Sequence, residues 1–427
     1  MVIILKKFIV KKTVNLKGTV KVSGSKNASI PIICTSIIHK DKITLKNVPR
    51  ISDVLLIIKI LKYLSCKVRF RRNTLTIDSK KIKYKPLSID ECRRLRGSYY
   101  LIGPMLNLFG KCIITLPGGC NIGKRPIDAH IDMLNAFGYE TNINDNILYI
   151  NKIEDKPSIN YRLSKRSVGA SINAILTSLT CNKAIISNLV IEPEAMNLID
   201  FLRELGYHIE STLDVCITCG RLYIPDEIKF KIIPDRIEAM TFIIMGLLCG
   251  DIKVKGSIPY HYNTSLTYLM DAGYNVKLRG DTVRAKKSFG QAFNIKTDFY
   301  PLFPTDMQPL FAVLLSIAKG SCCIEEGVFE DRMQIFKDLN NCGGYVNIIG
   351  NKAYIVGVEA LERHNFKALD LRHSAALALL VLAYGGEVYG IEYIERGYEA
   401  FFFKIRQLGA QFDLKNVTEK HIKNSLN

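Results

Sequence analysis

Cys120 is the residue in this sequence whose surroundings most clearly suggest chemistry. It lies in the segment LPGGCNIGKRPID, residues 116–128, where three glycines and Pro117 surround the thiol and two cations follow it. Structural cysteines are usually buried among apolar neighbours, whereas a thiol beside a helix N-terminus is in a setting that tunes its reactivity. The segment therefore predicts a chemically active thiol, with an incidental cysteine as the alternative.

The elements on either side of Cys120 can be predicted from local sequence. Residues 113–114 are expected to end a strand before it. After it, Ile127, Ile131 and Leu134 fall at helical spacing, and Pro126 suits the first turn of that helix. The thiol is thus expected on a loop that joins a strand to a helix.

The other cysteines suggest packing rather than a pairing framework. The 427 residues include 12 cysteines scattered along the chain, which fits a reducing compartment. Cys216 and Cys219 form a CxxC pair, but no second pair follows it. Val215 and Ile217 alternate as in a strand, so strand packing is favoured over the alternative of a metal or redox site.

Charge and hydropathy limit the function classes only loosely. The formal net charge of +19 fits nucleic acid, an acidic membrane surface or anionic small substrates, and a lysine-rich composition bias explains it equally well. No basic stretch is interleaved with aromatic residues. No apolar run approaches the roughly 20 residues that cross a bilayer. We expect a soluble cytoplasmic protein without nucleic acid and without membrane insertion.

A repeat of about 70 residues organises the chain. An apolar helix, a strand and a second, amphipathic helix recur six times, and paired strand-like segments close each unit. One such pair is Tyr139–Asn144 with residues 147–150, turned by Asp145 and Asn146. Each second helix is expected to end near a residue suited to a helix C-terminus. These ends are Ser65, Gly138, Gly206, Gly273, Gly343 and Gly409.

The first helix of every unit is nearly all apolar, which is typical of helices buried in a core. Strands and second helices are expected to cover these helices, giving two compact domains of three units each and an α/β fold class. The first helices are expected at residues 28–38, 99–109, 170–179, 239–248, 310–318 and 375–384.

Polar groups stand just before each buried helix. Capping accounts for some of them, such as Asp235 with Glu238 and Thr305 with Gln308. The positions are Lys26 and Asn27, Arg96 and Ser98, residues 167–169, residues 235–238, Thr305 and Asp306, and Asp370 with Arg372.

Capping does not account for the cations in this set. Lys26, Arg96 and Arg372 would stand at the positive ends of helix dipoles, where a cation is disfavoured unless an anion lies nearby. Helix N-termini combined with arginines bind phosphate and carboxylate groups well. An anion at these positions is therefore expected.

The motifs resemble the UDP-N-acetylglucosamine 1-carboxyvinyltransferases, a family of enolpyruvyl transferases, over nearly the whole chain. The shikimate-pathway enolpyruvyl transferases share the six-unit architecture but lack the cysteine loop and FPTDMQ, so they match less well. The matching segments are GSKNA (24–28), residues 116–128, SVGA (167–170), EPE (192–194), PDRIE (234–238), FPTDMQ (303–308), DLR (370–372) and RGYE (396–399).

The resemblance implies a two-domain inside-out α/β barrel built from six repeated α/β units. Residues 26–233 would form one domain with the cysteine lid loop, and residues 1–25 plus 234–427 would form the other with the general base. It also implies transfer of the enolpyruvyl group of phosphoenolpyruvate to the 3′-hydroxyl of UDP-N-acetylglucosamine, with release of phosphate and without cofactor or metal. This reaction is the first committed step of peptidoglycan precursor synthesis.

Site residues follow from the same resemblance. Cys120 matches the acid, which can form a covalent adduct and is the target of fosfomycin, and Asp306 matches the base. Lys26, Arg125 and Arg396 match the phosphoenolpyruvate clamp. The other substrate positions are Arg96 and Arg372 near the clamp, Asn27 at the sugar, Pro126, Asp128, Ser167, Val168, Gly169 and Val328 at the uridine diphosphate, and Ile127 and Thr305.

Two other functions remain open from sequence. The chain could be a diverged enolpyruvyl transferase with another acceptor, or a non-catalytic regulatory paralogue, although the acid, base and clamp are all present. One departure from the family pattern is His373, which follows Arg372 where the family has alanine.

Overall fold

Two compact units make up the part of the chain that the structure describes. This computed structural model describes residues 4–11, 15–116 and 127–418. The middle unit contains residues 24–116 and 127–233, and the terminal unit contains the described residues up to Ser23 and from Pro234 onward. Each unit has its own hydrophobic core. Cys120, Arg125 and Pro126 lie outside the described residues.

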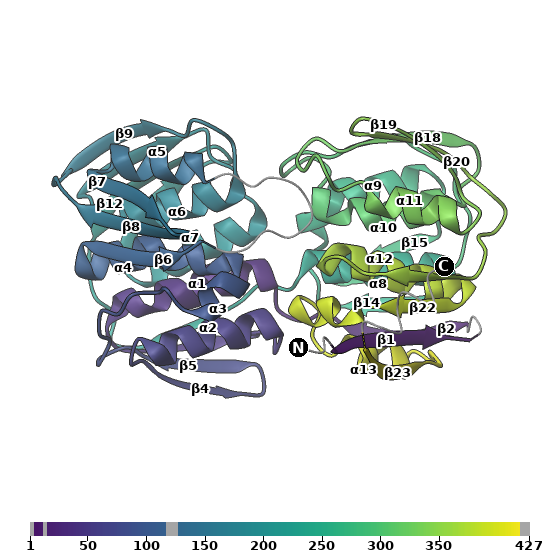
Figure 1. The fold of residues 1–427 in the computed structure, drawn as a ribbon, viewed down its shortest axis with the longest axis horizontal. Coiled ribbons are helices and arrows are strands. Elements are labelled where there is room, and N and C mark those ends of the chain that lie inside the picture. Colours follow the sequence, from purple (N-terminus) through teal and green to yellow (C-terminus); the bar gives the residue numbers. More distant parts are fainter. Residues whose placement is uncertain (1–3, 12–14, 117–126, 419–427) are drawn as a thin grey trace. The chain divides into compact units, whose positions relative to one another are not determined.

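Three helix pairs and three sheets form the described middle unit (Figure 1). The buried first helices are α1 (Lys26–Thr35), α4 (Ile102–Phe109) and α6 (Val168–Ser178), and the second helices are α2 (Ser52–Tyr63), α5 (Asp128–Ala136) and α7 (Pro193–Glu204). Shorter helices are η1 (Ser36–His39), α3 (Asp90–Arg94) and η2 (Arg96–Leu101).

The sheets of the middle unit combine antiparallel hairpins with a parallel edge pair in two cases, β13 with β3 and β9 with β10. Their orders are β13-β3-β5-β4, β6-β8-β7 and β11-β12-β10-β9. The strands are β3 (Lys42–Lys46), β4 (Lys67–Arg71), β5 (Thr74–Asp78), β6 (Lys111–Thr115), β7 (Tyr139–Asn144), β8 (Ile147–Lys152), β9 (Ser158–Arg162), β10 (Lys183–Ser187), β11 (Tyr207–Ser211), β12 (Val215–Arg221) and β13 (Ile228–Lys231).

The terminal unit repeats this plan in its described residues. Its first helices are α8 (Arg236–Cys249), α10 (Gln308–Leu315) and α12 (Leu371–Tyr384), and its second helices are α9 (Asn263–Asp271), α11 (Gln334–Asn341) and α13 (Phe401–Gln407). Short 3-10 helices are η3 (Pro259–Tyr262), η4 (Thr305–Met307) and η5 (Ile391–Arg396).

The N-terminal strands belong to the sheets of this unit, because β1 lies between β22 and β23, and β2 pairs in parallel with β14. The orders are β15-β16-β14-β2, β17-β18-β20-β19 and β21-β22-β1-β23. The strands are β1 (Ile4–Val10), β2 (Leu16–Lys21), β14 (Gly250–Lys255), β15 (Val276–Arg279), β16 (Thr282–Lys286), β17 (Ile295–Lys296), β18 (Ser321–Glu325), β19 (Tyr345–Ile349), β20 (Lys352–Val356), β21 (His364–Lys367), β22 (Gly386–Tyr389) and β23 (Asp413–Thr418).

Apolar helices lie inside the units and sheets lie outside. Every residue of α8 is buried, which follows from its almost entirely apolar sequence after the charged first turn that contains Arg236 and Glu238. Strands such as β3 bury alternate residues, Ile43 and Leu45, and turn the residues between them outward. Among the described helices, none is long and apolar enough to cross a membrane.

The predicted ends of the second helices are confirmed. All six residues adopt the left-handed conformation, with φ of 71° at Ser65, 84° at Gly138, 92° at Gly206, 78° at Gly273, 83° at Gly343 and 98° at Gly409. The turn at Asp145 and Asn146, with φ of 48° and 62°, joins β7 to β8 as predicted.

The first helices differ from their predicted limits near proline and hydroxyl residues. The predicted helix 99–109 begins as η2, because Pro104 cannot donate the helical hydrogen bond to residue 100. The predicted helix 28–38 becomes 3-10 after Thr35, where the hydroxyls of Thr35 and Ser36 donate to the carbonyls of Pro31 and Ile32.

Candidate active site

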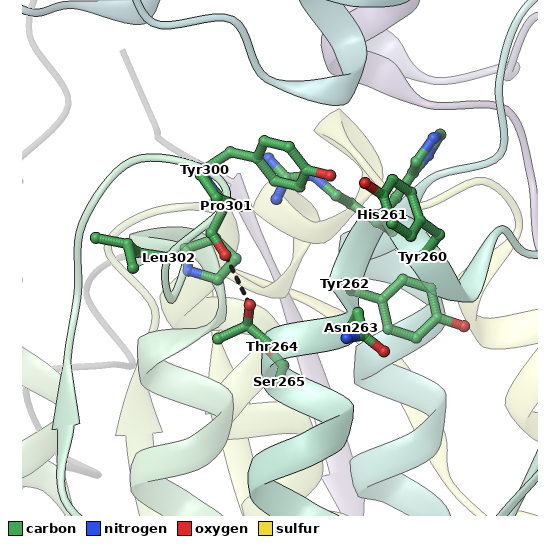
Figure 2. A pocket seen from close by; sticks show the side chains of 11 residues that line it. Tyr260, His261, Tyr262, Asn263, Thr264, Ser265, Tyr300, Pro301 and Leu302 are labelled. Carbon is green, nitrogen blue, oxygen red and sulfur yellow. Dashed lines mark hydrogen bonds between the residues drawn. The ribbon is translucent and has the colours of Figure 1, made fainter. Parts of the chain in front are cut away.

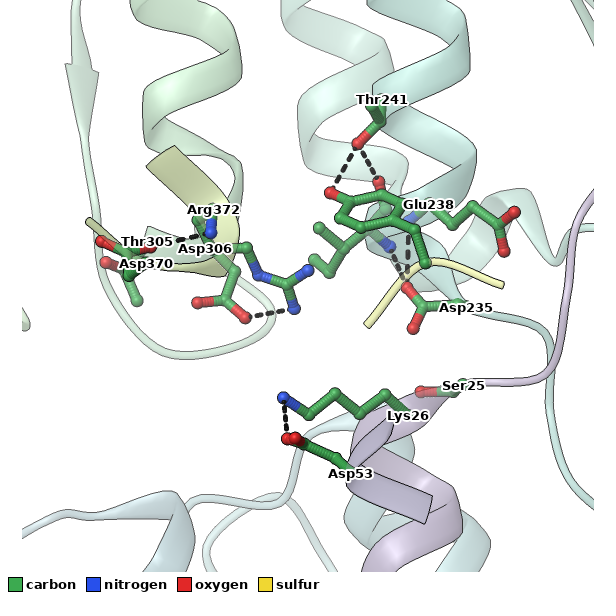
Figure 3. Close-up of polar contacts among 12 residues, drawn as sticks. Ser25, Lys26, Asp53, Asp235, Glu238, Thr241, Thr305, Asp306, Asp370 and Arg372 are labelled. Atoms are coloured by element: carbon green, nitrogen blue, oxygen red, sulfur yellow. Dashed lines mark hydrogen bonds and ion pairs between the residues drawn. The ribbon is translucent and has the colours of Figure 1, made fainter. Parts of the chain in front are cut away.

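Asp306 is the centre of a cluster of polar side chains in the terminal unit. It lies in η4, which leads into the buried helix α10. Its Oδ1 is 2.9 Å from Nη1 of Arg332, and its Oδ2 is 2.7 Å from Nη2 of Arg372 (Figure 3 shows the bond to Arg372). Both arginine side chains are only 7% exposed. Two guanidinium groups from different elements therefore share one carboxylate.

The pKa of Asp306 follows from these neighbours. Burial raises it, but the charges of Arg372 and Arg332 outweigh burial and hold the pKa of this carboxyl far below its usual range. Asp306 is consequently ionised throughout the physiological pH range. A carboxylate held so firmly is a weak base until its arginines engage another anion.

Arg332 and Glu326 complete this terminal cluster, which we define as Thr305, Asp306, Glu326, Arg332 and Arg372. Nη1 of Arg332 also donates to Oγ1 of Thr305 at 2.8 Å, and that hydroxyl donates to Oε2 of the buried Glu326 at 3.0 Å. Arg332 and Glu326 were not predicted from the sequence. The available signal was their position between a strand and a second helix, which corresponds to that of the cysteine loop in the repeat.

Val328 is held beside the same cluster. Its backbone N–H donates to Oε1 of Glu326 at 2.9 Å, and the N–H of Phe329 donates to that oxygen at 3.1 Å. Since Glu326 also binds Thr305, one buried carboxylate joins the predicted substrate residues Thr305 and Val328. The predicted capping pair of Thr305 and Gln308 is wrong, because Oγ1 of Thr305 donates to Glu326 and Nε2 of Gln308 donates to the carbonyl of Arg332.

Arg372 stands at the N-terminus of α12, where Asp370 is the cap. Oδ1 of Asp370 accepts from the backbone N–H groups of Arg372 at 2.8 Å and His373 at 3.1 Å. The guanidinium of Arg372 lies 5.9 Å from the ring centre of Tyr398. Burial lowers the pKa of Arg372, but the charge of Asp306 raises it above its ordinary value overall.

Lys26 opens α1 in the middle unit. Its Nζ is 2.8 Å from Oδ2 of Asp53, whose side chain is 2% exposed, in the first turn of α2 (Figure 3). Oγ of Ser25 caps the helix by accepting from the N–H of Ala28 at 3.4 Å. Asn27 is the second residue of α1. Asp53 was not identified from sequence, although an acidic residue in the first turn of a second helix was visible there.

These contacts identify the anions that were expected beside two of the helix-terminal cations. The anion beside Lys26 is the carboxylate of Asp53, and the anion beside Arg372 is that of Asp306. Both pairings are electrostatically sound, because each carboxylate offsets a cation at the positive end of a helix. The expected anions are thus supplied by the protein itself at these two positions.

Breaking the pair in the middle unit should weaken the fold. Asp53→Asn leaves the half-buried Lys26 beside a neutral amide, so we expect the free energy of unfolding to fall by about 2–3 kcal/mol. Urea unfolding measures this loss. Asp90→Asn is the control, since Asp90 and Arg93 form an exposed pair whose removal should cost less than about 1 kcal/mol. Equal losses in the two variants would contradict the prediction.

Four of the residues predicted to bind uridine diphosphate lie on packed elements of the middle unit, whereas Val328 lies in the terminal unit; the four are Asp128, Ser167, Val168 and Gly169. Ser167 caps α6 by accepting from the N–H of Ala170, and Val168 and Gly169 form its first turn. Helix α5 packs against α6, and η2 packs against both α1 and α6. Asp128 opens α5, with Ile127 before it, and Arg96 opens η2.

His130 is a buried neighbour of this group that was not predicted from the sequence. A Cβ atom on Gly169 would lie 3.6 Å from its Nε2, and its Nδ1 is 3.3 Å from Nδ2 of Asn173. Burial, and to a lesser extent the charge of Arg96, lower the pKa of His130 to about 4. The ring is therefore neutral at physiological pH.

This lowered pKa predicts a loss of stability in acid. Above pH 6.5 the ring is neutral in both states, whereas between pH 6.5 and about 4 the unfolded chain binds a proton that the folded chain does not. The free energy of unfolding of the parent should therefore fall by about 3 kcal/mol across that range because of His130, and this part of the fall should be absent in His130→Gln. Urea unfolding at several pH values measures the difference. His208→Gln, at an exposed histidine, is the control, and its free energy of unfolding should depend on pH as that of the parent does. The same dependence in His130→Gln would contradict the role given to His130.

A small pocket adjoins the segment that carries Asp306. Its volume is about 110 Å³, and its lining includes the buried Arg236, the exposed Tyr260, residues 300–302 and Pro304. Figure 2 shows Oγ1 of Thr264 donating to the carbonyl of Pro301, at 2.6 Å, which fixes the loop leading to Thr305.

The remaining predicted positions are placed as follows. Arg396 ends η5 in the terminal unit.

Cys216 and Cys219 lie in β12, three residues apart and so on opposite faces, which confirms the strand interpretation. Within the described ranges, no group of three or more histidine, cysteine, aspartate or glutamate residues is placed to hold a metal ion.

The chain is similar to carboxyvinyltransferases in sequence. It matches the family model described as EPSP synthase (3-phosphoshikimate 1-carboxyvinyltransferase) over residues 10–405. It is 34% identical to UDP-N-acetylglucosamine 1-carboxyvinyltransferase 1 of Legionella pneumophila, covering 95% of this chain and 82% of that protein. It is 37% identical to the UDP-N-acetylglucosamine 1-carboxyvinyltransferase of Wolbachia pipientis, covering 92% and 96%.

Solved structures share its fold. The enolpyruvyl transferase NikO from Streptomyces tendae superposes with a TM-score of 0.86 at 21% identity, covering 97% of this chain and 99% of that chain. EPSP synthase from Acinetobacter baumannii has a TM-score of 0.75 at 15% identity, covering 96% and 99%. The predicted two-domain inside-out α/β fold is confirmed. The chain belongs to the EPSP synthase family and, within it, to the UDP-N-acetylglucosamine 1-carboxyvinyltransferases.

Proposed function

We propose that this protein transfers the enolpyruvyl group of phosphoenolpyruvate to the 3′-hydroxyl of UDP-N-acetylglucosamine and releases phosphate. The observation that carries the proposal is Asp306 held between Arg332 and Arg372. A carboxylate and two buried cations at one place are what a reaction between a hydroxyl group and a dianionic substrate requires. The names of the sequence relatives support the same reaction.

The chemistry assigns a role to each charge. The sugar hydroxyl gives its proton to Asp306 as its oxygen bonds to C2 of phosphoenolpyruvate, while Cys120 delivers a proton to the methylene carbon. The resulting adduct then breaks its C2–O bond to phosphate as the new methyl group returns one proton to the Cys120 thiolate, which restores the C=C bond, and the proton on Asp306 leaves with the phosphate. The arginines stabilise the carboxylate and phosphate of the substrate as positive charge develops at C2. When these anions engage Arg332 and Arg372, the hold of those cations on Asp306 weakens and the pKa of Asp306 rises, so substrate binding itself makes the base competent.

The other predicted residues take supporting roles in this proposal. Lys26, Arg125 and Arg396 bind phosphoenolpyruvate, with Asp53 as the counter-ion of Lys26 before the substrate arrives. We propose domains of residues 26–233 and of residues 1–25 plus 234–427. The contacts proposed for UDP-N-acetylglucosamine are Asn27, Arg96, Pro126, Ile127, Asp128, Ser167, Val168, Gly169, Thr305 and Val328.

The test is a coupled assay of phosphate release from phosphoenolpyruvate with two acceptors. We expect release with UDP-N-acetylglucosamine and none above background with shikimate 3-phosphate. The second acceptor is included because the matching family model is described as 3-phosphoshikimate 1-carboxyvinyltransferase. Turnover only with shikimate 3-phosphate, or with neither acceptor, would overturn the proposal.

The cellular role follows from the reaction. The product, an enolpyruvyl ether of UDP-N-acetylglucosamine, is a precursor of peptidoglycan, and we place the step in the cytoplasm, at the start of cell-wall synthesis. Depletion of the protein in its host should raise the pool of UDP-N-acetylglucosamine and reduce peptidoglycan, which metabolite analysis and cell-wall quantification measure.

Cys120 should be the site of covalent inhibition. Fosfomycin carries a phosphonate that the substrate cations would bind, which brings its epoxide to the nearest thiol. Peptide mass mapping should find one adduct, on Cys120, among the 12 cysteines. Cys120→Asp should keep some acid function and resist the compound, whereas Cys219→Ser, at a partly exposed cysteine of β12, should stay sensitive. An adduct elsewhere would remove Cys120 from the assignment.

A further inference from the structure

The two arginines that hold Asp306 come from two different segments of the terminal unit. Arg332 lies just before α11, whereas Arg372 lies in the first turn of α12. Their spacing therefore depends on how α11 is fixed to the start of α12. A side chain that joins these two helices would set the geometry of both cations.

His373 is such a side chain. It follows Arg372 directly, is 4% exposed, and its Nε2 lies 2.7 Å from Oδ2 of Asp338 on α11. Its Nδ1 is 3.2 Å from the backbone nitrogen of Leu369 and accepts that N–H. The imidazole thus joins α11 to the loop that leads into α12.

The hydrogen bonds also define the tautomer. Because Nδ1 accepts from a backbone amide, it carries no proton, and the ring proton lies on Nε2 and is donated to Asp338. Asp338 is itself buried, and its Oδ1 accepts from Nε2 of Gln334 at 3.4 Å. Asp338 lies six residues after Arg332 along the same segment and helix. The link therefore connects the segment of one arginine to the segment of the other.

We propose that His373 is a positioning residue for the transfer reaction, holding Arg372 and Arg332 at the spacing that binds the substrate anion, through its hydrogen bond to Asp338. It touches no reacting atom. The expected change in KM rests on the proposed function. The expected change in the position of Arg372 rests on the terminal cluster alone.

The kinetic test compares variants of His373 that keep or lose the hydrogen bond from Nε2 to Asp338. His373→Gln places an amide donor near the position of Nε2 and should keep the bond to Asp338, whereas His373→Asn is too short to reach it and His373→Ala removes it. We expect the KM for phosphoenolpyruvate to rise about tenfold, equivalent to about 1.4 kcal/mol, in the Asn and Ala variants and to stay near the parent value in the Gln variant. The KM for UDP-N-acetylglucosamine should change little in all three.

The partner and a control complete the set. Asp338→Ala should raise the KM for phosphoenolpyruvate as much as His373→Ala does. The double variant should have no higher KM than either single variant, because the two residues act through one bond. His39→Ala removes another buried histidine, which contacts Arg221 in the middle unit, and should lower stability without changing the KM for phosphoenolpyruvate.

A second readout needs no substrate. While its ion pair restrains rotation, the guanidinium of Arg372 should give separate 15N resonances for its two terminal nitrogens. These should remain separate in the parent and in His373→Gln, and should merge in His373→Ala and His373→Asn. This measurement tests the positioning role even if the phosphate-release assay fails, so the two proposals fail in different ways.

The outcomes are decisive in either direction. Separate Arg372 resonances in His373→Ala would overturn the positioning role, whatever the enzyme assay gives. In an active enzyme, a KM for phosphoenolpyruvate that is unchanged in His373→Ala would also overturn it. An equal rise for both substrates, or the same rise in His39→Ala, would reduce His373 to a general contribution to stability and overturn the proposal as well.

Discussion

Asp306→Asn is expected to reduce turnover by roughly 10²–10⁴-fold while leaving the affinity for UDP-N-acetylglucosamine nearly unchanged. The amide keeps the shape of the carboxylate but cannot accept the hydroxyl proton. It can also accept from only one of the two guanidinium groups that now share Asp306, so its NH₂ group faces the other cation. Turnover and stability should therefore both fall, for separate reasons.

The stability loss has its own pH dependence. The folded-state pKa of Asp306 lies below its unfolded value, so its stabilising contribution is present above about pH 4 and is lost as the pH falls toward the folded pKa. The unfolding free energies of the parent and Asp306→Asn should accordingly converge in acid. If Asp306 only complemented the helix dipole, its loss would cost about 0.3–1 kcal/mol and leave turnover intact.

Asp251→Asn is the matched control for Asp306→Asn. Asp251 also binds an arginine through both oxygens, with Nε and Nη2 of Arg284 at 2.7 Å and 2.5 Å, but on the outside of a sheet in the same unit. Its replacement should leave turnover unchanged. Steady-state kinetics and calorimetric titration of the UDP-sugar measure the two properties. Normal turnover in folded Asp306→Asn would exclude Asp306 as the base.

Arg372→Ala is expected to lower kcat/KM for phosphoenolpyruvate by about 10²–10³-fold, the loss typical for removal of one preorganised group that stabilises transition-state charge. The helix should still begin at the same place, because Asp370 caps it through the backbone N–H groups of Arg372 and His373. The effect should thus reflect the missing cation rather than an unfolded helix.

Arg372→Lys distinguishes charge from geometry at this position. Lysine keeps the positive charge but lacks the planar group that binds Asp306 beside Tyr398, so we expect activity between those of the parent and Arg372→Ala. Arg284→Ala removes the arginine of the sheet-surface pair and should have no effect on kcat/KM. A kcat/KM in Arg372→Ala equal to the parent's would place Arg372 outside the substrate site.

Local sequence was sufficient to predict the repeats and many element boundaries. The glycines and the serine that end these helices adopt a left-handed conformation, and helices that are apolar on all sides are buried. Both features depend on short stretches of sequence, so both can be predicted locally. The exceptions came from equally local chemistry. Pro104 and the hydroxyls of Thr35 and Ser36 turned helical turns into 3-10 turns at two places.

Sequence by itself determined that Lys26, Asp306 and Arg372 stand at helix N-termini, because position along a repeat depends only on neighbours in the chain. Their partners were decided by tertiary structure. Asp306 and Arg372 are 66 residues apart, and Arg332 and Asp53 have no local signature of the charge each one meets. An ion pair depends on the distance between side chains from separate elements, and that distance is fixed only when the helices pack.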